Sequence, residues 1–267
     1  MKADVILSFQ DVAQGFIRMG RRVDALVGTS LDIYAGEFVT VVGPSGCGKS
    51  TLLNLASGLL NSTAGKVTFK GRTISGVNTK IGYVTQADNL FPWRTMRQNV
   101  EFALEVRGQQ ASERRARAEE LIHKVGLTGF EDHYPYELSG GMRQRTNIIR
   151  TLAYDPEVIL MDEPFGPLDA QTRLILQSQL LDLWGEAKKT IIFVTHDLGE
   201  AVALADRVVV MTARPGRIKV IEKVPLPRPR NIFRIHDDPR FRETYDSLWD
   251  SLEQEVKISS DSALIRS

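Results

Sequence analysis

The sequence predicts an α/β fold built on a parallel sheet that is covered on both faces. Several short runs are continuous, apolar and rich in β-branched residues, and they lie at 38–42, 158–161, 191–194 and 208–211. Such runs are typical of parallel strands that are buried on both sides. The first run also leads into a glycine-rich turn and then into a helical pattern at 50–59, which is the strand–turn–helix order of an α/β unit.

The segments around this core predict different structures. Short, half-alternating runs at 5–9, 31–33 and 67–69 are typical of an antiparallel fringe. A further strand is predicted at 81–84, where another apolar run precedes a polar residue. We found no internal repeat.

The long interval before residue 158 predicts a helical insertion at about residues 87–155. Apolar residues recur there at helical spacing, at Ala118, Leu121, Ile122 and Val125. After residue 214 four prolines punctuate an extended connector, and residues 238–255 show a short amphipathic pattern. We therefore divide the chain into a main domain at 1–225 and a C-terminal extension at 226–267, with a short helix and a frayed end.

Composition and charge limit the function classes. The chain has 267 residues, of which 42% are hydrophobic and 25% charged, as in folded globular proteins. Its 34 basic and 33 acidic residues give a net charge of +1, so there is no electrostatic reason to expect a nucleic-acid partner. The longest uncharged stretch, 50–65, predicts no membrane-spanning helix because it contains Ser, Thr, Asn and Gly. One cysteine and an N-terminus without a secretory pattern lead us to expect a reducing cytoplasm.

Residues 43–50 fit the pattern GxxxxGK[ST], a glycine-rich loop between a strand and a helix. Backbone N–H groups of such a loop point at one place, where a helix N-terminus also favours negative charge. This phosphate loop predicts a polyphosphate site, in which Lys49 reaches the β- and γ-phosphates and the Ser50 hydroxyl binds Mg²⁺. A chance glycine turn is the alternative, which the flanking elements disfavour. The expected nucleotide-binding residues are Gly43, Pro44, Ser45, Gly46, Cys47, Gly48, Lys49, Ser50 and Thr51.

The apolar run at 158–161 ends in two carboxylates, Asp162 and Glu163. The carboxyl ends of strands are where α/β sheets place their ligands. Asp162 is expected to hold the Mg²⁺ through water, and Glu163 to act as the general base that polarises the attacking water. On its own, a strand that ends in Asp-Glu is equally compatible with a capped turn. Together with the phosphate loop it predicts a nucleotide-hydrolysing site.

Two more polar residues follow predicted strands, Gln86 after 81–84 and His196 after 191–194. Both side chains are expected at the same edge of the sheet as Asp162, where they converge on the γ-phosphate. A lone Gln or His is more often a surface or capping residue. The strand-end positions favour the functional interpretation here, with Gln86 and His196 as catalytic residues beside Glu163.

Residues 138–145, LSGGMRQR, resemble the LSGGQ signature of ABC-transporter ATPase subunits. The order along the chain also resembles that family: phosphate loop, Gln86, signature, Asp162, His196. The resemblance covers about residues 5–215. It implies a P-loop NTPase fold, in which an ABC ATPase domain has a RecA-like parallel-sheet core, an antiparallel β fringe and a helical subdomain.

The resemblance also implies roles for individual residues. Ser139, Gly140 and Gly141 would bind nucleotide held by the opposite subunit, which makes the active unit a dimer around two ATP molecules. Gln86 would add a ligand to the Mg²⁺. Phe16 would stack on adenine, although a Phe in a half-apolar strand is more often a core residue.

The sequence departs from the family pattern at two places. The helix after the signature reads RTNIIRTLA where RVAIARALA is typical, and Pro167 stands where relatives commonly have Ala. Neither departure touches a phosphate ligand. They concern the dimer interface and the packing of the helix.

Several stretches resemble the ATPase subunits of nitrate, sulfonate and taurine importers, namely PSGCGKSTLL, LFPWRTMRQNV, MDEPFG and PLPRPR. Such a subunit would power solute uptake through a separate transmembrane permease, as a peripheral protein at the cytoplasmic face of the inner (plasma) membrane. Its partners would be the permease, a second cassette that is identical or different, and indirectly a periplasmic solute-binding protein. The ATPase does not touch the solute, so these residues do not identify it.

Two other functional classes are alternatives. A soluble ABC ATPase that acts on nucleic acid or ribosomes would carry a long coiled coil or a second cassette, and this sequence has neither. An exporter cassette is usually fused to a transmembrane domain, and the importer-like tail disfavours a split exporter.

The loop that follows Gln86 contains two large aromatics, Phe91 and Trp93, on either side of Pro92. Such a loop either packs on its own domain or forms a partner surface. The resemblance implies that it helps to form the groove for the permease's coupling helix. We therefore expect Trp93→Ala and Phe91→Ala to leave the isolated chain folded and to weaken its assembly with the permease.

Overall fold

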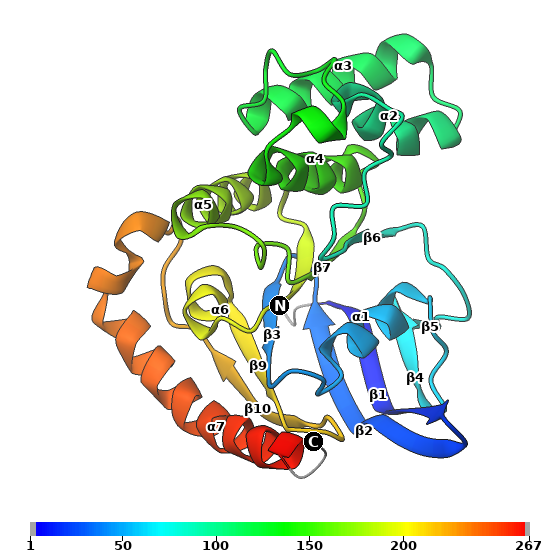
Figure 1. Ribbon diagram of the computed structural model, residues 1–267. Helices are drawn as coiled ribbons and strands as arrows, with labels where there is room; N and C mark the ends of the chain where they lie inside the picture. The colour runs from blue at the N-terminus through cyan, green and yellow to red at the C-terminus, as the bar shows by residue number, and fades with distance from the viewer. Residues whose placement is uncertain (1–3, 265–267) are drawn as a thin grey trace.

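The computed structural model describes residues 4–264 and contains a six-stranded and a four-stranded sheet (Figure 1). The six-stranded sheet has the order β10-β9-β3-β8-β7-β6, in which β9, β3, β8, β7 and β6 pair in parallel and β10 pairs antiparallel with β9. Its strands are β3 (Phe38–Val42), β6 (Ile81–Val84), β7 (Val158–Asp162), β8 (Thr190–Val194), β9 (Arg207–Met211) and β10 (Ile218–Lys223). The parallel sheet predicted from the apolar runs is confirmed.

Helices cover both faces of this sheet, which is why its central strands are apolar throughout. Phe38 and Phe193 belong to a hydrophobic cluster with α5 (Ala170–Ala187) and α6 (Leu198–Leu204). Val39, Val41 and Ile192 belong to a second cluster, on the side of α1 (Lys49–Ser57). Alternate residues of one strand therefore enter different cores, and β3 and β8 are buried at every position.

The antiparallel fringe is confirmed, and its first two strands are longer than predicted. The four-stranded sheet has the order β2-β1-β4-β5. Its strands are β1 (Val5–Arg18), β2 (Arg21–Tyr34), β4 (Ala64–Phe69) and β5 (Arg72–Thr73). The β1–β2 register shifts repeatedly, including between Phe9 and Val12, where Asp11 has a φ of 50°. These irregularities interrupt the apolar–polar alternation, so the sequence pattern indicates only fragments of the hairpin.

A helical layer lies at one end of the molecule, at the top of Figure 1. It consists of α2 (Met96–Val106), α3 (Ala111–Lys124) and α4 (Gly140–Ala153), with a short 3₁₀ turn at Pro135–Glu137 before α4. The three helices share their own hydrophobic cluster, which contains Ala118, Leu121, Ile122 and Val125. The helical insertion predicted from those residues is therefore present.

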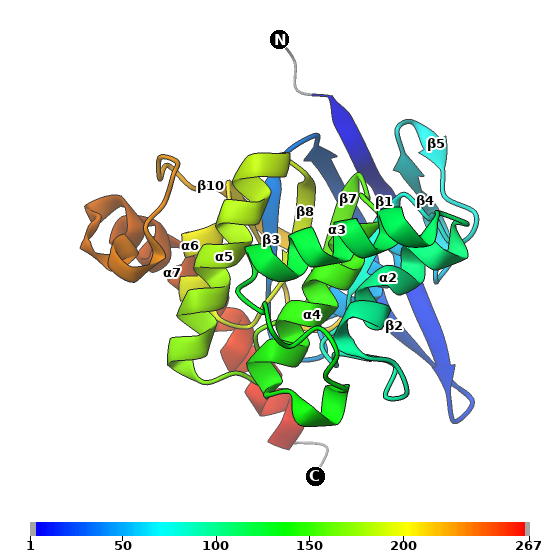
Figure 2. The ribbon, with the colours of Figure 1, turned by 90° about the horizontal axis from the view of Figure 1, so that it is seen from above.

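The C-terminal extension packs on the sheet and contains a longer helix than predicted. A 3₁₀ helix at Ile232–Asp237 precedes α7 (Pro239–Leu264), which continues past the expected end at residue 255. After Pro239 the helix contains no Pro or Gly that would end it. Phe241, Leu248 and Leu252 join the cluster beneath α5 and α6. Figures 1 and 2 both show α7 on the side of the molecule away from α2 and α3.

Candidate functional site

The phosphate loop lies where β3 ends and α1 begins, and its glycines fit a crowded backbone. Gly48 has a φ of 107°, and a Cβ built on it would lie 2.9 Å from the carbonyl oxygen of Ala25 and 2.7 Å from a methyl of Leu26. A Cβ at Gly43 would lie 2.9 Å from the Cys47 sulfur. The loop is therefore held close to β2, and larger residues at Gly43 or Gly48 would displace it.

The start of α1 has the features of an anion site. Its N-cap, Gly48, makes no side-chain capping hydrogen bond, and the first turn contains no acidic residue. The first N–H groups of a helix have no partner inside the helix, and the helix dipole makes this end favourable for negative charge. The backbone here fits a phosphate group.

Lys49 is 6% exposed, and its amine sits within the loop itself. Nζ donates hydrogen bonds to the carbonyl oxygens of Gly43, at 2.8 Å, and Pro44, at 3.1 Å. A buried cation with two neutral acceptors gains from an anionic partner. This position fits the predicted contact with phosphate.

Asp162 ends β7 beside the phosphate loop, where it accepts a hydrogen bond from the Ser50 hydroxyl. The Tyr83 hydroxyl donates to Asp162 Oδ2 at 3.4 Å. Burial raises the pKa of Asp162, the nearby charge of Glu163 raises it further, and the hydrogen bond from Ser50 opposes both effects. A hydroxyl and a carboxylate at one place supply the oxygen ligands that Mg²⁺ prefers, so these residues fit that ion.

Glu163 and His196 are in contact, as their strand-end positions predict. Nδ1 of His196 lies 3.1 Å from Oε2 of Glu163. Glu163 has a φ of 44°, and its N–H donates to the carbonyl oxygen of Val194 at 2.9 Å. A left-handed backbone at a residue with a side chain costs on the order of 1–3 kcal/mol, and here it turns the chain just after the strand.

Gln86 reaches the loop that follows Glu163. Its Nε2 would lie 3.9 Å from a Cβ built on Gly166. Gln86 and Gly166 line a cavity of about 680 Å³, which also contains Asp88 and the signature residue Gly140. The structure therefore places Gln86 between the loop that follows Glu163 and the beginning of α4.

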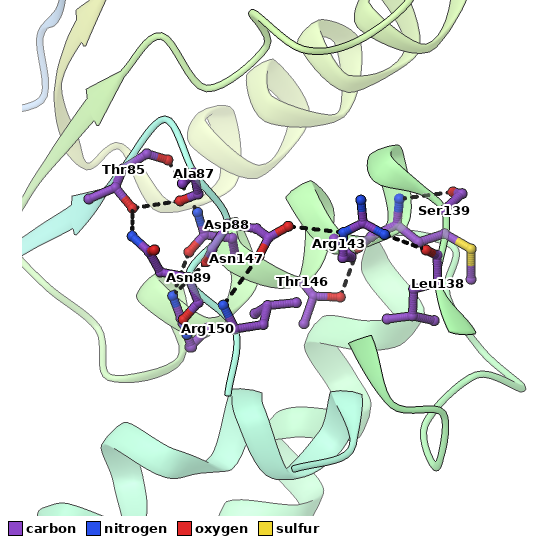
Figure 3. A network of polar contacts seen from close by, with 12 residues as sticks. Thr85, Ala87, Asp88, Asn89, Leu138, Ser139, Arg143, Thr146, Asn147 and Arg150 are labelled. Atoms are coloured by element: carbon purple, nitrogen blue, oxygen red, sulfur yellow. Dashed lines mark hydrogen bonds and ion pairs between the residues drawn. The ribbon is translucent and has the colours of Figure 1, made fainter. Parts of the chain in front are cut away.

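A polar network ties the segment after Gln86 to the signature helix (Figure 3). Arg143 pairs with Asp88 at 3.0 Å, and Arg150 donates to the carbonyl oxygens of Asp88, at 3.0 Å, and Asn89, at 2.8 Å. The Asn147 carboxamide accepts from Arg150 at 2.8 Å. No pattern in the sequence predicted these contacts. The available signal was Asn147, which stands at one of the departures in RTNIIRTLA.

The signature residues begin α4 and lie away from the phosphate loop of the same chain. Ser139 is the N-cap of α4, and its hydroxyl accepts the Met142 N–H at 3.3 Å. A Cβ at Gly141 would lie 2.7 Å from the Thr172 side chain. Figure 1 shows α4 in the helical layer, whereas α1 lies against the sheets. One chain does not bring its signature and its phosphate loop together.

Phe16 lies in β1 opposite Val23 and is 38% exposed. It belongs to none of the three hydrophobic clusters, so Phe16 is not a core residue. Further along the same pair of strands, Leu26 packs against Gly48 of the phosphate loop. The stacking of Phe16 on adenine stays a prediction.

The aromatics after Gln86 differ from each other in exposure. Trp93 is 71% exposed, whereas Phe91 is half-buried and packs edge-on against Phe102, with ring centroids 4.6 Å apart. Asn99, which is fully buried, holds this loop: its Oδ1 accepts the Phe91 N–H at 2.8 Å, and its Nδ2 lies within 3.2 Å of three carbonyl oxygens. Those oxygens belong to Phe91, Arg94 and Thr95.

The expectation that Phe91 and Trp93 behave alike therefore does not fit the structure. Phe91 is partly a packing residue, because the short loop turns it inward against α2. The role of Asn99 was not predicted either, and an Asn at a buried helical position was the available signal.

Comparisons with known proteins agree with this geometry. The sequence pattern of the family described as ABC transporter matches residues 26–166. An uncharacterized ABC transporter ATP-binding protein of Methanocaldococcus jannaschii is 54% identical over 85% of this chain and 85% of its own length.

Two importer subunits are also similar. A taurine import ATP-binding protein of Jannaschia sp. is 42% identical over 94% of this chain and 96% of its own length. An aliphatic sulfonates import ATP-binding protein of Bacillus licheniformis is 45% identical over 84% of this chain and 87% of its own length. Among solved structures, a dimeric ATP-binding cassette in a post-hydrolysis state, bound to ADP and Pi, has a TM-score of 0.75 and 34% identity over 83% of this chain and 100% of its own.

Proposed function

This chain belongs to the ABC transporter family and is an ATP-binding subunit with ATPase activity, and we propose that it powers a bacterial importer for a nitrate-, sulfonate- or taurine-like solute. The part of this proposal that concerns ATP hydrolysis is supported most directly by the meeting of four strand ends at one place. The phosphate loop after β3, Gln86 after β6, Asp162 at the end of β7 and His196 after β8 all lie at the carboxyl edge of one parallel sheet. Each contributes a group that phosphate hydrolysis needs.

The residues of this edge take distinct roles in the proposed reaction. The loop N–H groups and Lys49 bind the phosphates, and Ser50, Asp162 and Gln86 hold the Mg²⁺. When bound, the metal neutralises charge on the transferred phosphoryl group. Glu163 accepts the proton of the attacking water, and His196, 3.1 Å from its carboxylate, orients that base.

Two copies of the chain complete each site in this proposal. Ser139, Gly140 and Gly141 lie at a helix N-terminus that their own phosphate loop does not reach, so we assign them to nucleotide on the opposite subunit. The similar solved cassette is a dimer, which supports this arrangement. The sandwiched nucleotide would link dimer closure to hydrolysis.

We assign the exposed loop around Trp93 to the permease contact. The loop that carries Trp93 leads into α2, and the first residue of α2 contacts the segment that precedes the signature, because the Met96 N–H donates to the carbonyl oxygen of His133 at 2.8 Å. That segment carries Tyr136, which is 75% exposed. Exposed aromatics suit the centre of a protein interface.

Membrane attachment in the proposal depends on that permease. No helix within residues 4–264 has both the length and the apolar character to cross a bilayer. The subunit would work at the cytoplasmic face of the inner membrane, as a peripheral partner of the permease and indirectly of a periplasmic binding protein.

Magnesium-dependent ATP hydrolysis by purified Asp162→Asn protein tests the assignment of the site. We expect turnover to fall by roughly 100-fold or more, because one carboxylate that holds the metal is lost. Asp155→Asn is the matched control, since the Asp155 carboxylate is 72% exposed and pairs with Lys189. Equal turnover in the two variants would exclude Asp162 from the metal site.

A further inference from the structure

The C-terminal helix α7 places a buried carboxylate next to the turn between β9 and β10. Glu255 is 7% exposed. Its Oε2 accepts the Ala213 N–H at 2.8 Å, and its Oε1 accepts from Lys219 Nζ at 2.8 Å. Figure 1 shows the C-terminal part of α7 beside this turn. The two oxygens together fasten both sides of the β9–β10 turn to the helix.

This turn, residues 212–217, lies directly behind the phosphate loop. β9 and β3 are parallel neighbours, so the turn after β9 and the loop after β3 leave the same edge of the sheet. A Cβ built on Gly216 would lie 1.9 Å from the carbonyl oxygen of Cys47. The backbones of the turn and the phosphate loop are therefore in close contact, and glycine is required there.

The turn also contacts the strand that supports the other side of the loop. The Gly216 N–H donates to the carbonyl oxygen of Ala25 at 2.8 Å, and its carbonyl oxygen accepts the Val27 N–H at 3.1 Å. Leu26, between these two residues, packs against Gly48. Gly216 thus joins β2 to the phosphate loop.

Cys47 lies at the centre of this packing. Its side chain is 1% exposed, and burial raises the pKa of its thiol, to which the negative charge of Glu255 also contributes. Because it is the one cysteine of the chain, its reactivity can report on how tightly the loop is packed.

We propose that Glu255 is a positioning residue through which the C-terminal helix holds the phosphate loop in its nucleotide-binding shape. Its hydrogen bonds to Ala213 and Lys219 hold the 212–217 turn against the phosphate loop. Within that turn, Gly216 is the residue that contacts Cys47. Loss of the carboxylate loosens the loop and weakens ATP binding, although Glu255 touches no nucleotide. The proposal rests on the assignment of residues 43–51 as the ATP site.

The test compares full-length Glu255→Ala, Lys219→Met and Glu253→Ala proteins with the wild type. Glu253 lies on the same helix and pairs with Lys257, so it is the matched control. For each protein we would measure the rate at which N-ethylmaleimide modifies Cys47 without nucleotide, the dissociation constant for ATP and the thermal midpoint. Glu255→Gln, which keeps the size and the Ala213 acceptor, replaces the alanine variant if that variant does not fold.

We expect Glu255→Ala and Lys219→Met both to speed the modification of Cys47, by about tenfold, because local opening exposes the thiol. Both should raise the ATP dissociation constant by about fivefold or more, while Glu253→Ala matches the wild type. The two test variants change the local charge in opposite directions, so a purely electrostatic effect on the thiol would move its reactivity in opposite directions and overturn the proposal.

Two other results would also overturn it. One is a lowered thermal midpoint with unchanged thiol reactivity and ATP affinity, which would make Glu255 a contributor to stability alone. The other is faster modification with unchanged ATP affinity. If the wild type itself does not bind ATP, the proposed ATP site fails, and the modification rates still decide whether Glu255 holds the loop.

Discussion

Nδ1 of His196 and Oε2 of Glu163 lie 3.1 Å apart, although 33 residues separate them in the chain. They follow neighbouring parallel strands, β8 and β7, which bring their side chains to one edge. The contact with His196 fixes the orientation of the carboxylate that we propose as the base.

Replacement of Glu163 by Gln should separate binding from chemistry. The amide keeps the shape of the side chain and the hydrogen bond to His196, but it does not accept a proton, so we expect ATP to bind while hydrolysis falls by about 100-fold or more. Size-exclusion chromatography should show an ATP-stabilised dimer. Glu113→Gln, at an exposed position of α3, is the control, and normal hydrolysis by Glu163→Gln would show that another group is the base.

Replacement of Lys49 by Ala should weaken ATP binding itself. The variant loses a charge-assisted contact of ~1.5–3 kcal/mol, which corresponds to about 10- to 150-fold in the dissociation constant. Isothermal titration with ATP measures the change, and Lys80→Ala, whose side chain is 63% exposed, is the control. Near-normal binding and turnover would disprove the assigned role of Lys49.

Much of this site was predictable from the sequence because the information is local. A strand that ends in Asp162-Glu163, or a loop that reads GPSGCGKS, specifies both the chemistry and its place on a parallel sheet. The contacts of Arg143 with Asp88 and of Glu255 with Ala213 join residues that are far apart in the chain. No periodicity indicates such pairs, since they depend on how the elements pack.

The long β1–β2 hairpin and the full length of α7 show the same limit. The hairpin's register shifts hide its alternation, and residues after 255 lack a stop signal that would mark the end of α7. Phe91 and Trp93 look equivalent in the sequence, and they differ in exposure because Phe91 packs on Phe102, a contact that no local pattern indicates.

A mixing experiment tests whether each site is shared between two chains. Ser139→Arg should place bulk where the partner's phosphate approaches, so this variant should bind ATP but fail to hydrolyse it. A heterodimer of Ser139→Arg and Lys49→Ala chains can rebuild one intact site, and we expect the mixture to recover part of the wild-type ATPase activity. Demonstrated heterodimers with no recovered activity would argue against the composite site.

Replacement of Asn99 by Ala should loosen the loop before α2. Four backbone groups lose a hydrogen bond to the carboxamide, of which the carbonyl oxygens of Phe91 and Thr95 keep a backbone N–H donor, and we expect the free energy of unfolding to fall by about 2 kcal/mol or more. Urea denaturation measures this loss. Asn54→Ala is the control, on a half-buried helical position of α1. Equal stability of the two variants would show that these hydrogen bonds do not hold the loop.

The different exposure of Trp93 and Phe91 gives the test that decides on the permease contact. Trp93→Ala removes a ring that is 71% exposed, so the isolated chain should keep its thermal midpoint and its affinity for ATP. Phe91→Ala removes a ring that packs on Phe102, so it should destabilise the isolated chain by about 1–3 kcal/mol.

If the exposed ring anchors the permease, truncation of Trp93 should weaken the complex by ~2 kcal/mol or more. A pull-down with the detergent-solubilised permease, run beside thermal unfolding of each variant, measures both effects. Should Trp93→Ala bind the permease as tightly as the wild type, the coupling surface lies elsewhere on the chain.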